Sequence, residues 1–153
     1  TTADNNNFDS AYGSTSCPFT VSDIQSCLQH TFGISQFRSH QLSIIQRILT
    51  GQDCFVIMRT GGGKSLTYQL PAVLERRRSP QNSNNNHKIT IVISPLMSLI
   101  DDQEEQMNMF VPNSAISFHS GLSKSQQQSN WSRLRQSTDN NTLEMMILFP
   151  CCL

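Results

Sequence analysis

The stretch VIMRTGGGKSLTYQLPA, from Val56 to Ala72, decides the fold class of this 153-residue chain. It begins inside an apolar run, Asp53–Met58, whose length and composition predict a strand buried on both faces. Three glycines follow this run, and a helical pattern starts at Lys64. A strand that enters a helix through a glycine-rich turn is typical of a loop that binds phosphate.

The residue types in this turn support that interpretation. The glycines at positions 61–63 allow the tight curl that points successive backbone N–H groups at one anion. Lys64 supplies a positive charge for the β- and γ-phosphates, and the Ser65 hydroxyl can ligate Mg²⁺. The full pattern G-x-x-x-x-G-K-[ST] requires glycine at position 58, where this chain has Met58. The alternative is a glycine-rich turn that only caps a helix, but the upstream apolar run and the Lys-Ser pair favour phosphate binding.

On the C-terminal side of this turn, apolar runs of strand length alternate with helical patterns. Ser94 and Pro95 have the residue types of an N-cap and a first helical position. Such alternation predicts crossover connections and a parallel sheet, so the fold class is α/β. The predicted strands are Ile89–Ser94, Ala115–His119 and Leu143–Phe149, and the predicted helices between them are Leu96–Met109 and Leu122–Gln136.

The N-terminal part divides into a polar segment and two helices. Residues 1–21 are rich in Asn, Ser and Thr and are predicted to form a disordered leader. Ser22 and Gln25 form a capping-box pattern that predicts the start of a helix ending at Gly33. A second helix is predicted from near Ser39 to Thr50, so the folded domain is expected to span residues 22–150.

Composition excludes several classes of protein. The five cysteines form no C-x-x-C pair, which argues against structural zinc and for free thiols. No apolar run approaches the ~20 residues that a membrane-spanning helix needs. The net charge of the chain is zero, yet the stretch Arg38–Lys88 contains eight Lys and Arg residues and only two Asp and Glu residues. That stretch would attract a phosphate-rich ligand, although Arg76–Arg78 have a sufficient explanation as the basic end of a helix.

Two longer stretches resemble one enzyme family. FGISQFRSHQLSIIQRILTGQDCFVIMRTGGGKSLTYQLPAVL, Phe32–Leu74, closely resembles the start of the helicase core of the RecQ family of DNA helicases. That family shows F-R-x-x-Q, then T-G-G-G-K-S, then Y-Q-x-P-A, and all three occur here at matching spacing. VISPLMSLIDDQ, Val92–Gln103, resembles the next motif of the family. The two stretches cover about half of the chain.

The resemblance implies a fold, an activity and a partner. The fold would be an incomplete first RecA-like P-loop lobe, with a parallel sheet and flanking helices. The chain would be the ATP- and nucleic-acid-binding portion of a superfamily 2, 3′–5′ DNA helicase that couples ATP hydrolysis to unwinding in the complete protein. Its ligands would be ATP, Mg²⁺ and single-stranded or partly duplex DNA. Its setting would be DNA repair and recombination, in the nucleus if the organism is eukaryotic and otherwise in the cytoplasm.

The resemblance also implies roles for individual residues. Gln41 would read the edge of adenine and Arg38 would lie against the same nucleotide, while Ile34 stands where many relatives carry an aromatic residue that stacks on the base. Lys64 would be the catalytic residue and Ser65 the Mg²⁺ ligand. The implied nucleotide-binding set is Ile34, Arg38, Gln41, Thr60, Gly61, Gly62, Gly63, Lys64 and Ser65, and the implied DNA-binding set is Ser94, Pro95 and Leu96.

Other side chains have simpler explanations. The acidic residues between Asp101 and Glu105 fit the solvated face of a helix better than a metal site. His119 is predicted to be structural, and Trp131 is predicted to dock a thin amphipathic helix.

The helicase chemistry needs residues that this sequence does not contain. No D-E-x-H string occurs in the 153 residues, so the predicted domain stops before the family's DEAH box. We therefore expect the chain alone to be inactive. Two alternatives remain open at this point: another P-loop NTPase, such as a small-molecule kinase, and a short protein that binds nucleotide or DNA without catalysis.

Overall fold

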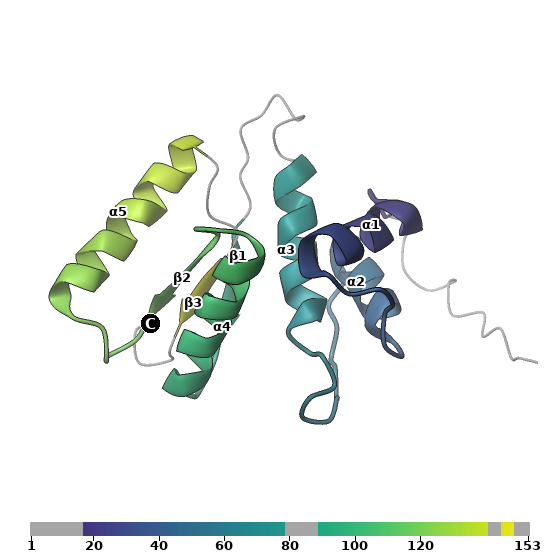
Figure 1. The fold of residues 1–153 in the computed structure, drawn as a ribbon, viewed down its shortest axis with the longest axis horizontal. Helices are drawn as coiled ribbons and strands as arrows, with labels where there is room; N and C mark the ends of the chain where they lie inside the picture. The colour runs from purple at the N-terminus through teal and green to yellow at the C-terminus, as the bar shows by residue number, and fades with distance from the viewer. Residues whose placement is uncertain (1–16, 79–88, 141–144, 149–153) are drawn as a thin grey trace, which may run out of the picture.

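The computed structural model describes residues 17–78, 89–140 and 145–148 (Figure 1). Within these ranges a group of helices precedes a small α/β unit. The helices are α1 (Val21–Phe32), α2 (Gln41–Leu49), α3 (Leu66–Arg78), α4 (Met97–Phe110) and α5 (Lys124–Asn140), and the strands are β1 (Thr90–Ile93), β2 (Ala115–Phe118) and β3 (Met145–Leu148).

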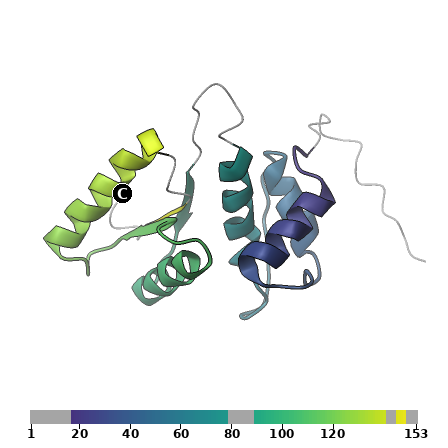
Figure 2. The same ribbon diagram turned by 45° about the horizontal axis from the view of Figure 1, so that its top comes forward.

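The three strands form one sheet in the order β1-β3-β2, and both pairs are parallel. Residue 145 of β3 lies opposite Thr90 of β1 and Ala115 of β2. Helix α4 connects β1 to β2 and helix α5 connects β2 to β3, and Figure 2 shows these helices on opposite faces of the sheet. Each connection is therefore a crossover, as parallel strands require.

One continuous core joins the sheet to the N-terminal helices. Helices α1 and α2 both pack on α3, at the side of the molecule away from α5 (Figure 1). The Phe32 ring of α1 meets the Phe110 ring of α4 with their centroids 4.9 Å apart. Fully buried members of this core come from α1, α2, α3, α4, β2 and β3: Ile24, Leu28, Ile45, Leu70, Ile100, Met107, Ala115 and Ile147.

The prediction that Asp53–Met58 forms a strand is wrong for the described structure. These residues belong to no strand, and the side chains of Phe55 and Ile57 are 93% and 85% exposed. A strand exists only where a neighbour accepts its backbone hydrogen bonds. Among the described residues β1, β3 and β2 pair only with one another, so this apolar run has no partner.

The first helix starts earlier than the sequence pattern indicated. Its N-cap is Thr20 rather than Ser22, and Asp23 rather than Gln25 completes the capping box. The Asp23 carboxylate accepts from the Thr20 N–H at 2.9 Å, and the Thr20 hydroxyl accepts from the Asp23 N–H at 3.1 Å. Hydrogen bonds from Thr20 lower the pKa of Asp23. Both patterns satisfy the capping rule, and the extended backbone of Thr20 selects this one.

The other four helices start later than predicted. Helix α2 begins at Gln41 instead of near Ser39, and helix α5 begins at Lys124 instead of Leu122. Helix α3 begins at Leu66, because Lys64 and Ser65 lie in the turn that precedes it. Helix α4 begins at Met97 with Leu96 as its N-cap, so the prediction that Ser94 caps this helix is wrong. The Ser94 hydroxyl instead donates to the Leu96 carbonyl at 3.5 Å, and Leu96 is extended.

Part of the predicted leader is ordered. Cys17 and Phe19 pack against the core, whereas residues 1–16 lie outside the described part. The polar stretches 79–88 and 141–144 also lie outside it, as do Cys151 and Cys152. Within the described ranges, no helix is long and apolar enough to cross a membrane.

The exposed apolar side chains lead to a prediction about stability. Besides Phe55 and Ile57, the β1 residues Ile91 and Ile93 are each 57% exposed, on a strand with one edge unpaired within the described sheet. Unpaired edges and apolar faces promote association between chains. We expect the isolated 153-residue chain to be marginally stable and to self-associate as concentration rises, measured by sedimentation and thermal unfolding. A sharp cooperative melt from a concentration-independent monomer would contradict this.

Candidate functional site

The glycine-rich turn forms a compact loop ahead of α3. Gly61 and Gly63 have positive φ angles of 74° and 83°, which L-residues with side chains rarely adopt. The Gly62 N–H donates to the Arg59 carbonyl at 3.0 Å, closing the turn. A Cβ atom on Gly62 would lie 2.9 Å from that same carbonyl oxygen. Glycine is therefore required at three consecutive positions for two reasons, backbone conformation and space.

The side chain of Lys64 lies over this loop. Its Nζ donates to the carbonyls of Met58 at 2.9 Å and of Arg59 at 3.0 Å. The ammonium group thus stands where the loop curls, and its charge has no carboxylate partner in these contacts. Two neutral carbonyls are weaker partners for an ammonium than an anionic oxygen is. The arrangement suits a cation that can exchange these bonds for bonds to phosphate.

Arg38 and Gln41 support the loop from its other side. The Arg38 guanidinium donates to the Gly61 carbonyl at 2.5 Å, and the Gln41 Nε2 donates to the Gly63 carbonyl at 3.0 Å. The Gln41 Oε1 accepts from the Arg38 N–H at 2.7 Å, so the two supports are themselves connected. Gln41 is only 2% exposed and is the first residue of α2. The helix therefore fixes the amide against the loop.

A cavity of about 510 Å³ opens beside the loop and extends to α4. It contains most of the residues that the sequence assigned to nucleotide binding. Ile34 stands at its wall and is 37% exposed. Arg38 and Gln41 reach the site through the loop carbonyls rather than as wall residues. The lining consists of Phe32, Ile34, Thr60, Gly61, Gly63, Lys64, Ser65, Leu66, Gln69, Leu99, Gln103, Gln106 and Phe110.

The sequence analysis missed the far wall of this cavity. Gln69 comes from α3, and Gln103 and Phe110 come from α4, more than thirty positions further along the chain. Gln69 follows Ser65 by four positions, which places both on one face of the helical turn. That spacing was a usable signal for Gln69. Gln103 ends the quoted motif Val92–Gln103, but the sequence did not place it or Phe110 beside the loop, because only packing brings α4 there.

The cavity is nearly free of charge. Lys64 is the single charged side chain in its lining as described. Next to the loop, burial raises the pKa of the Tyr68 phenol, and a hydrogen bond with Ser65 acts in the opposite direction. The phenol therefore stays protonated and neutral at physiological pH. In the lining, an anionic ligand would meet the cation Lys64, the hydroxyls of Thr60 and Ser65, and no carboxylate.

The segment predicted to contact DNA lies elsewhere, at the carboxyl end of β1. Ser94 is 5% exposed, whereas Leu96 and Met97 are 56% and 42% exposed. Ser94 and Leu96 are absent from the lining of the cavity. The Ser120 hydroxyl, after β2, lies 3.4 Å from the Met97 sulfur, so the ends of both strands meet at this edge. The edge is accessible to a ligand but separate from the phosphate loop.

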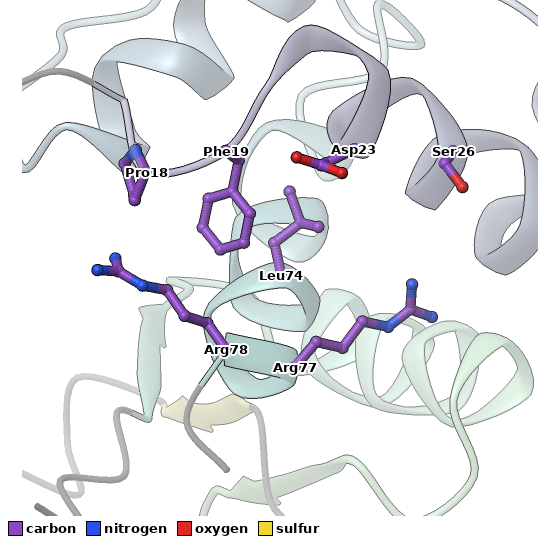
Figure 3. A pocket seen from close by; sticks show the side chains of 7 residues that line it. All are labelled: Pro18, Phe19, Asp23, Ser26, Leu74, Arg77 and Arg78. Atoms are coloured by element: carbon purple, nitrogen blue, oxygen red, sulfur yellow. The ribbon is translucent and has the colours of Figure 1, made fainter. Parts of the chain in front are cut away.

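A second cavity, of about 410 Å³, lies between the start of α1 and the end of α3 (Figure 3). Leu74 and Phe19 form its apolar floor, and Arg77 and Arg78 reach out from the end of α3 in different directions. The Arg77 guanidinium donates to the Thr31 hydroxyl at 2.7 Å. Arg76–Arg78 form the last turn of α3, the basic helix end that was predicted, and the Arg77 contact links this end to α1. The cavity shares no residue with the glycine-rich turn.

The acidic face of α4 faces solvent, as predicted, with one exception. Asp101 is 62% exposed, but its carboxylate lies 2.9 Å from the Nε2 of His119, a side chain that is 7% exposed. The His119 Nδ1 accepts from the Gly121 N–H at 3.2 Å. These contacts support the structural role predicted for His119. Within the described ranges, no three His, Cys, Asp or Glu residues are grouped as metal ligands.

Trp131 docks α5 on the sheet, as predicted. Its ring lies against that of Phe118 in β2, with centroids 4.7 Å apart. The Asn130 side-chain amide donates to the Ser117 carbonyl at 2.8 Å and fixes the same helix. Trp131 as a whole is 51% exposed, so it covers the sheet without being buried.

Comparison with known proteins agrees with this geometry. Residues 38–150 match the family model described as DEAD/DEAH box helicase. The fission yeast ATP-dependent DNA helicase hus2/rqh1 is 46% identical over 85 residues, which are 56% of this chain and 6% of that protein. The budding yeast ATP-dependent helicase SGS1 is 49% identical over 80 residues, 52% of this chain and 5% of its own length. The Xenopus laevis RecQ-like DNA helicase BLM is 50% identical over 76 residues, 50% of this chain and 5% of its own length.

The chain thus spans about one-twentieth of these relatives. The range of the family model contains the glycine-rich turn. The family model covers well over half of the chain, and the α/β elements, the phosphate loop and the supporting Arg38 and Gln41 all lie within its range or at its start. This chain belongs to the DEAD/DEAH box helicase family, and the resemblance to RecQ-family helicases predicted from its motifs is confirmed.

Proposed function

We propose that the chain is the ATP- and nucleic-acid-binding portion of a RecQ-like 3′–5′ DNA helicase, built as part of the first RecA-like lobe. The observation that supports it most directly is the set of contacts around the glycine loop. Lys64, Arg38 and Gln41 all hold backbone carbonyls of this loop. The lining of the cavity beside it includes six of the nine residues that family resemblance assigns to nucleotide.

Within this proposal each residue has a physical task. ATP phosphates would take over the Lys64 ammonium from the carbonyls of Met58 and Arg59 and receive the N–H groups of the loop. Mg²⁺ bound with ATP would neutralise phosphate charge, with Ser65 as its protein ligand. Ile34 would pack against the base. In the complete protein, hydrolysis at this site would drive unwinding of DNA that also contacts the Ser94–Leu96 segment.

Gln41 has the capacity to do two things. A carboxamide carries two N–H donors and two acceptor lone pairs, and its bonds to Gly63 and Arg38 use one of each. One donor and one acceptor remain for an edge of adenine, where the 6-amino group donates and the neighbouring ring nitrogen accepts. Guanine has an acceptor oxygen at position 6 in place of the amino group, so it does not offer this pair. The site should therefore prefer ATP to GTP.

A nucleotide titration of the 153-residue chain tests this assignment. We expect Gln41→Ala to weaken ATP binding by about 1–2 kcal/mol, the range for one buried polar pairing. Loss of the support to Gly63 alone would weaken ATP and GTP equally, so the ATP/GTP ratio isolates base recognition. Lys64→Ala is the control that weakens both nucleotides. Equal affinity of the unaltered chain for ATP and GTP would remove the base-reading role.

The main competing function is that of a different P-loop NTPase, such as a small-molecule kinase. It shares the phosphate loop but gives no reason for Gln41 or for SPLMSLIDDQ after β1. Binding of single-stranded DNA separates the two. We expect DNA to bind and to be lost gradually with added salt, as phosphate contacts require.

A further inference from the structure

Two glutamines in the cavity wall have buried polar atoms without a hydrogen-bond partner. They are the Nε2 of Gln69, on α3, and the Oε1 of Gln103, on α4. Gln69 is 2% exposed, and both residues line the cavity beside the phosphate loop. Buried polar groups in folded proteins are nearly always hydrogen-bonded, because leaving one unpaired costs about 1–3 kcal/mol. The unmet donor and the unmet acceptor in this cavity are therefore available to a ligand that binds there.

The position of the pair narrows the choice of ligand. The Gln69 N–H donates to the Ser65 carbonyl at 3.0 Å, so Gln69 lies one helical turn beyond the residue assigned to Mg²⁺. Gln103 reaches the same cavity from the opposite helix. The carboxylates of α4 do not share this space, because Asp101, Glu104 and Glu105 line a separate hollow on its surface. Within the described lining, the only side-chain acceptors are therefore neutral hydroxyls and amides.

A hydrated Mg²⁺ ion bound to phosphate offers a partner for both the unmet donor of Gln69 and the unmet acceptor of Gln103. Mg²⁺ keeps several water molecules when it binds through one or two protein ligands, and those waters are polarised hydrogen-bond donors. They need an acceptor, which Gln103 Oε1 supplies without adding charge. Phosphate oxygens need donors beyond the loop, which Gln69 Nε2 supplies. Each unmet atom thus matches one half of a magnesium–triphosphate complex.

We propose that Gln69 and Gln103 form an outer subsite for the magnesium complex of a nucleoside triphosphate. Gln103 accepts a hydrogen bond from a water held by the metal, and Gln69 donates one to a phosphate oxygen. This inference rests on the proposed function, since it assumes that ATP enters the cavity at Lys64 and Ser65. It makes these two glutamines positioning residues that act on the hydrated metal and the phosphates.

The test measures ATP affinity of the full 153-residue chain twice, in excess Mg²⁺ and in EDTA. Outer-sphere partners of a metal typically change its affinity by 10–100-fold. We expect Gln103→Leu to reduce affinity about 10-fold in Mg²⁺ and to leave it unchanged in EDTA. Gln103→Glu, which keeps the shape and adds charge, should retain or increase the gain from Mg²⁺. Gln69→Met should reduce affinity about 10-fold in both conditions, because it loses a phosphate donor.

Gln128→Leu is the matched control. Gln128 is an exposed glutamine on α5, and it is absent from the lining of the cavity and has no buried unmet atom. We expect its ATP affinity to equal that of the unaltered chain in both conditions. Far-UV circular dichroism confirms that each variant keeps its helices before it is titrated.

Three results overturn the inference while leaving ATP binding intact. They are the same loss for Gln103→Leu with and without Mg²⁺, no loss for either glutamine variant, and a loss for Gln128→Leu as large as theirs. Failure of the unaltered chain to bind ATP in Mg²⁺ is a different result. It would overturn the proposed function, and this inference with it.

Discussion

Purified alone, the 153-residue chain is expected to hydrolyse ATP at least about 10³-fold more slowly than a complete helicase of its family. The loop and Lys64 hold phosphates in substrate and transition state alike, and such uniform binding does little for turnover. An arginine supplied to the γ-phosphate is alone worth ~10³–10⁵ in rate, about 4–7 kcal/mol. No D-E-x-H string is present in these residues to orient the attacking water. The two losses are not additive, since such groups act as a unit.

A phosphate-release assay measures this directly, with and without single-stranded DNA. Lys64→Ala is the control, because it removes the charge from the loop and shows the background. We expect the two proteins to differ little. Turnover near one per second that DNA stimulates and that Lys64→Ala abolishes would show that these residues already form a complete catalytic site.

Gly63→Ala is expected to have the largest effect of any single methyl group added to the loop. A Cβ on Gly63 would lie 2.4 Å from the Gln41 Nε2, well inside contact distance. Gln41 is buried and bonded on both sides, so it has no free direction in which to move. The backbone of Gly63, at φ 83°, adds the strain of a left-handed conformation, about 1–2 kcal/mol. Overpacking adds about 1–3 kcal/mol more.

Gly33→Ala separates the two costs. Gly33 also has a positive φ, 65°, at the end of α1, but a Cβ there would have no heavy atom within 4 Å. Urea unfolding should therefore show backbone strain alone in Gly33→Ala and strain plus overpacking in Gly63→Ala. ATP affinity should fall only in the latter. Equal destabilisation by both variants would mean that Gln41 yields to the added methyl and does not support the loop rigidly.

These predictions concern parts of the molecule to which local sequence patterns pointed. The glycines, Lys64 and Ser65 were assigned from the chemistry of an anion-binding turn, which depends on a few neighbouring residues, and their binding of phosphate stays a prediction. The strands β1, β2 and β3 lie within the predicted runs, because β-rich apolar segments between helices leave few alternatives. Helix starts were placed less accurately. Two overlapping capping patterns compete at Thr20 and Ser22, and local sequence does not separate them.

Asp53–Met58 shows the limit of such reasoning. Its composition is that of a buried strand, yet its residues are unpaired and Phe55 is 93% exposed. A helix satisfies its own backbone, whereas a strand depends on hydrogen bonds from another segment. Composition can therefore predict that a segment favours pairing, but pairing itself depends on what lies beside it.

By itself the sequence determined the family, the α/β class and the chemistry of the loop, since each is written in residues close together along the chain. Only the tertiary structure decided which side chains from distant segments share the cavity. The family resemblance implied that Gln41 reads a base, which stays a prediction, and the tertiary structure shows that its side chain donates to the Gly63 carbonyl. Gln69 and Gln103 became candidates only when α3 and α4 were placed together around one cavity. Contacts between helices depend on the shape and volume of the whole core, to which residues from six elements contribute.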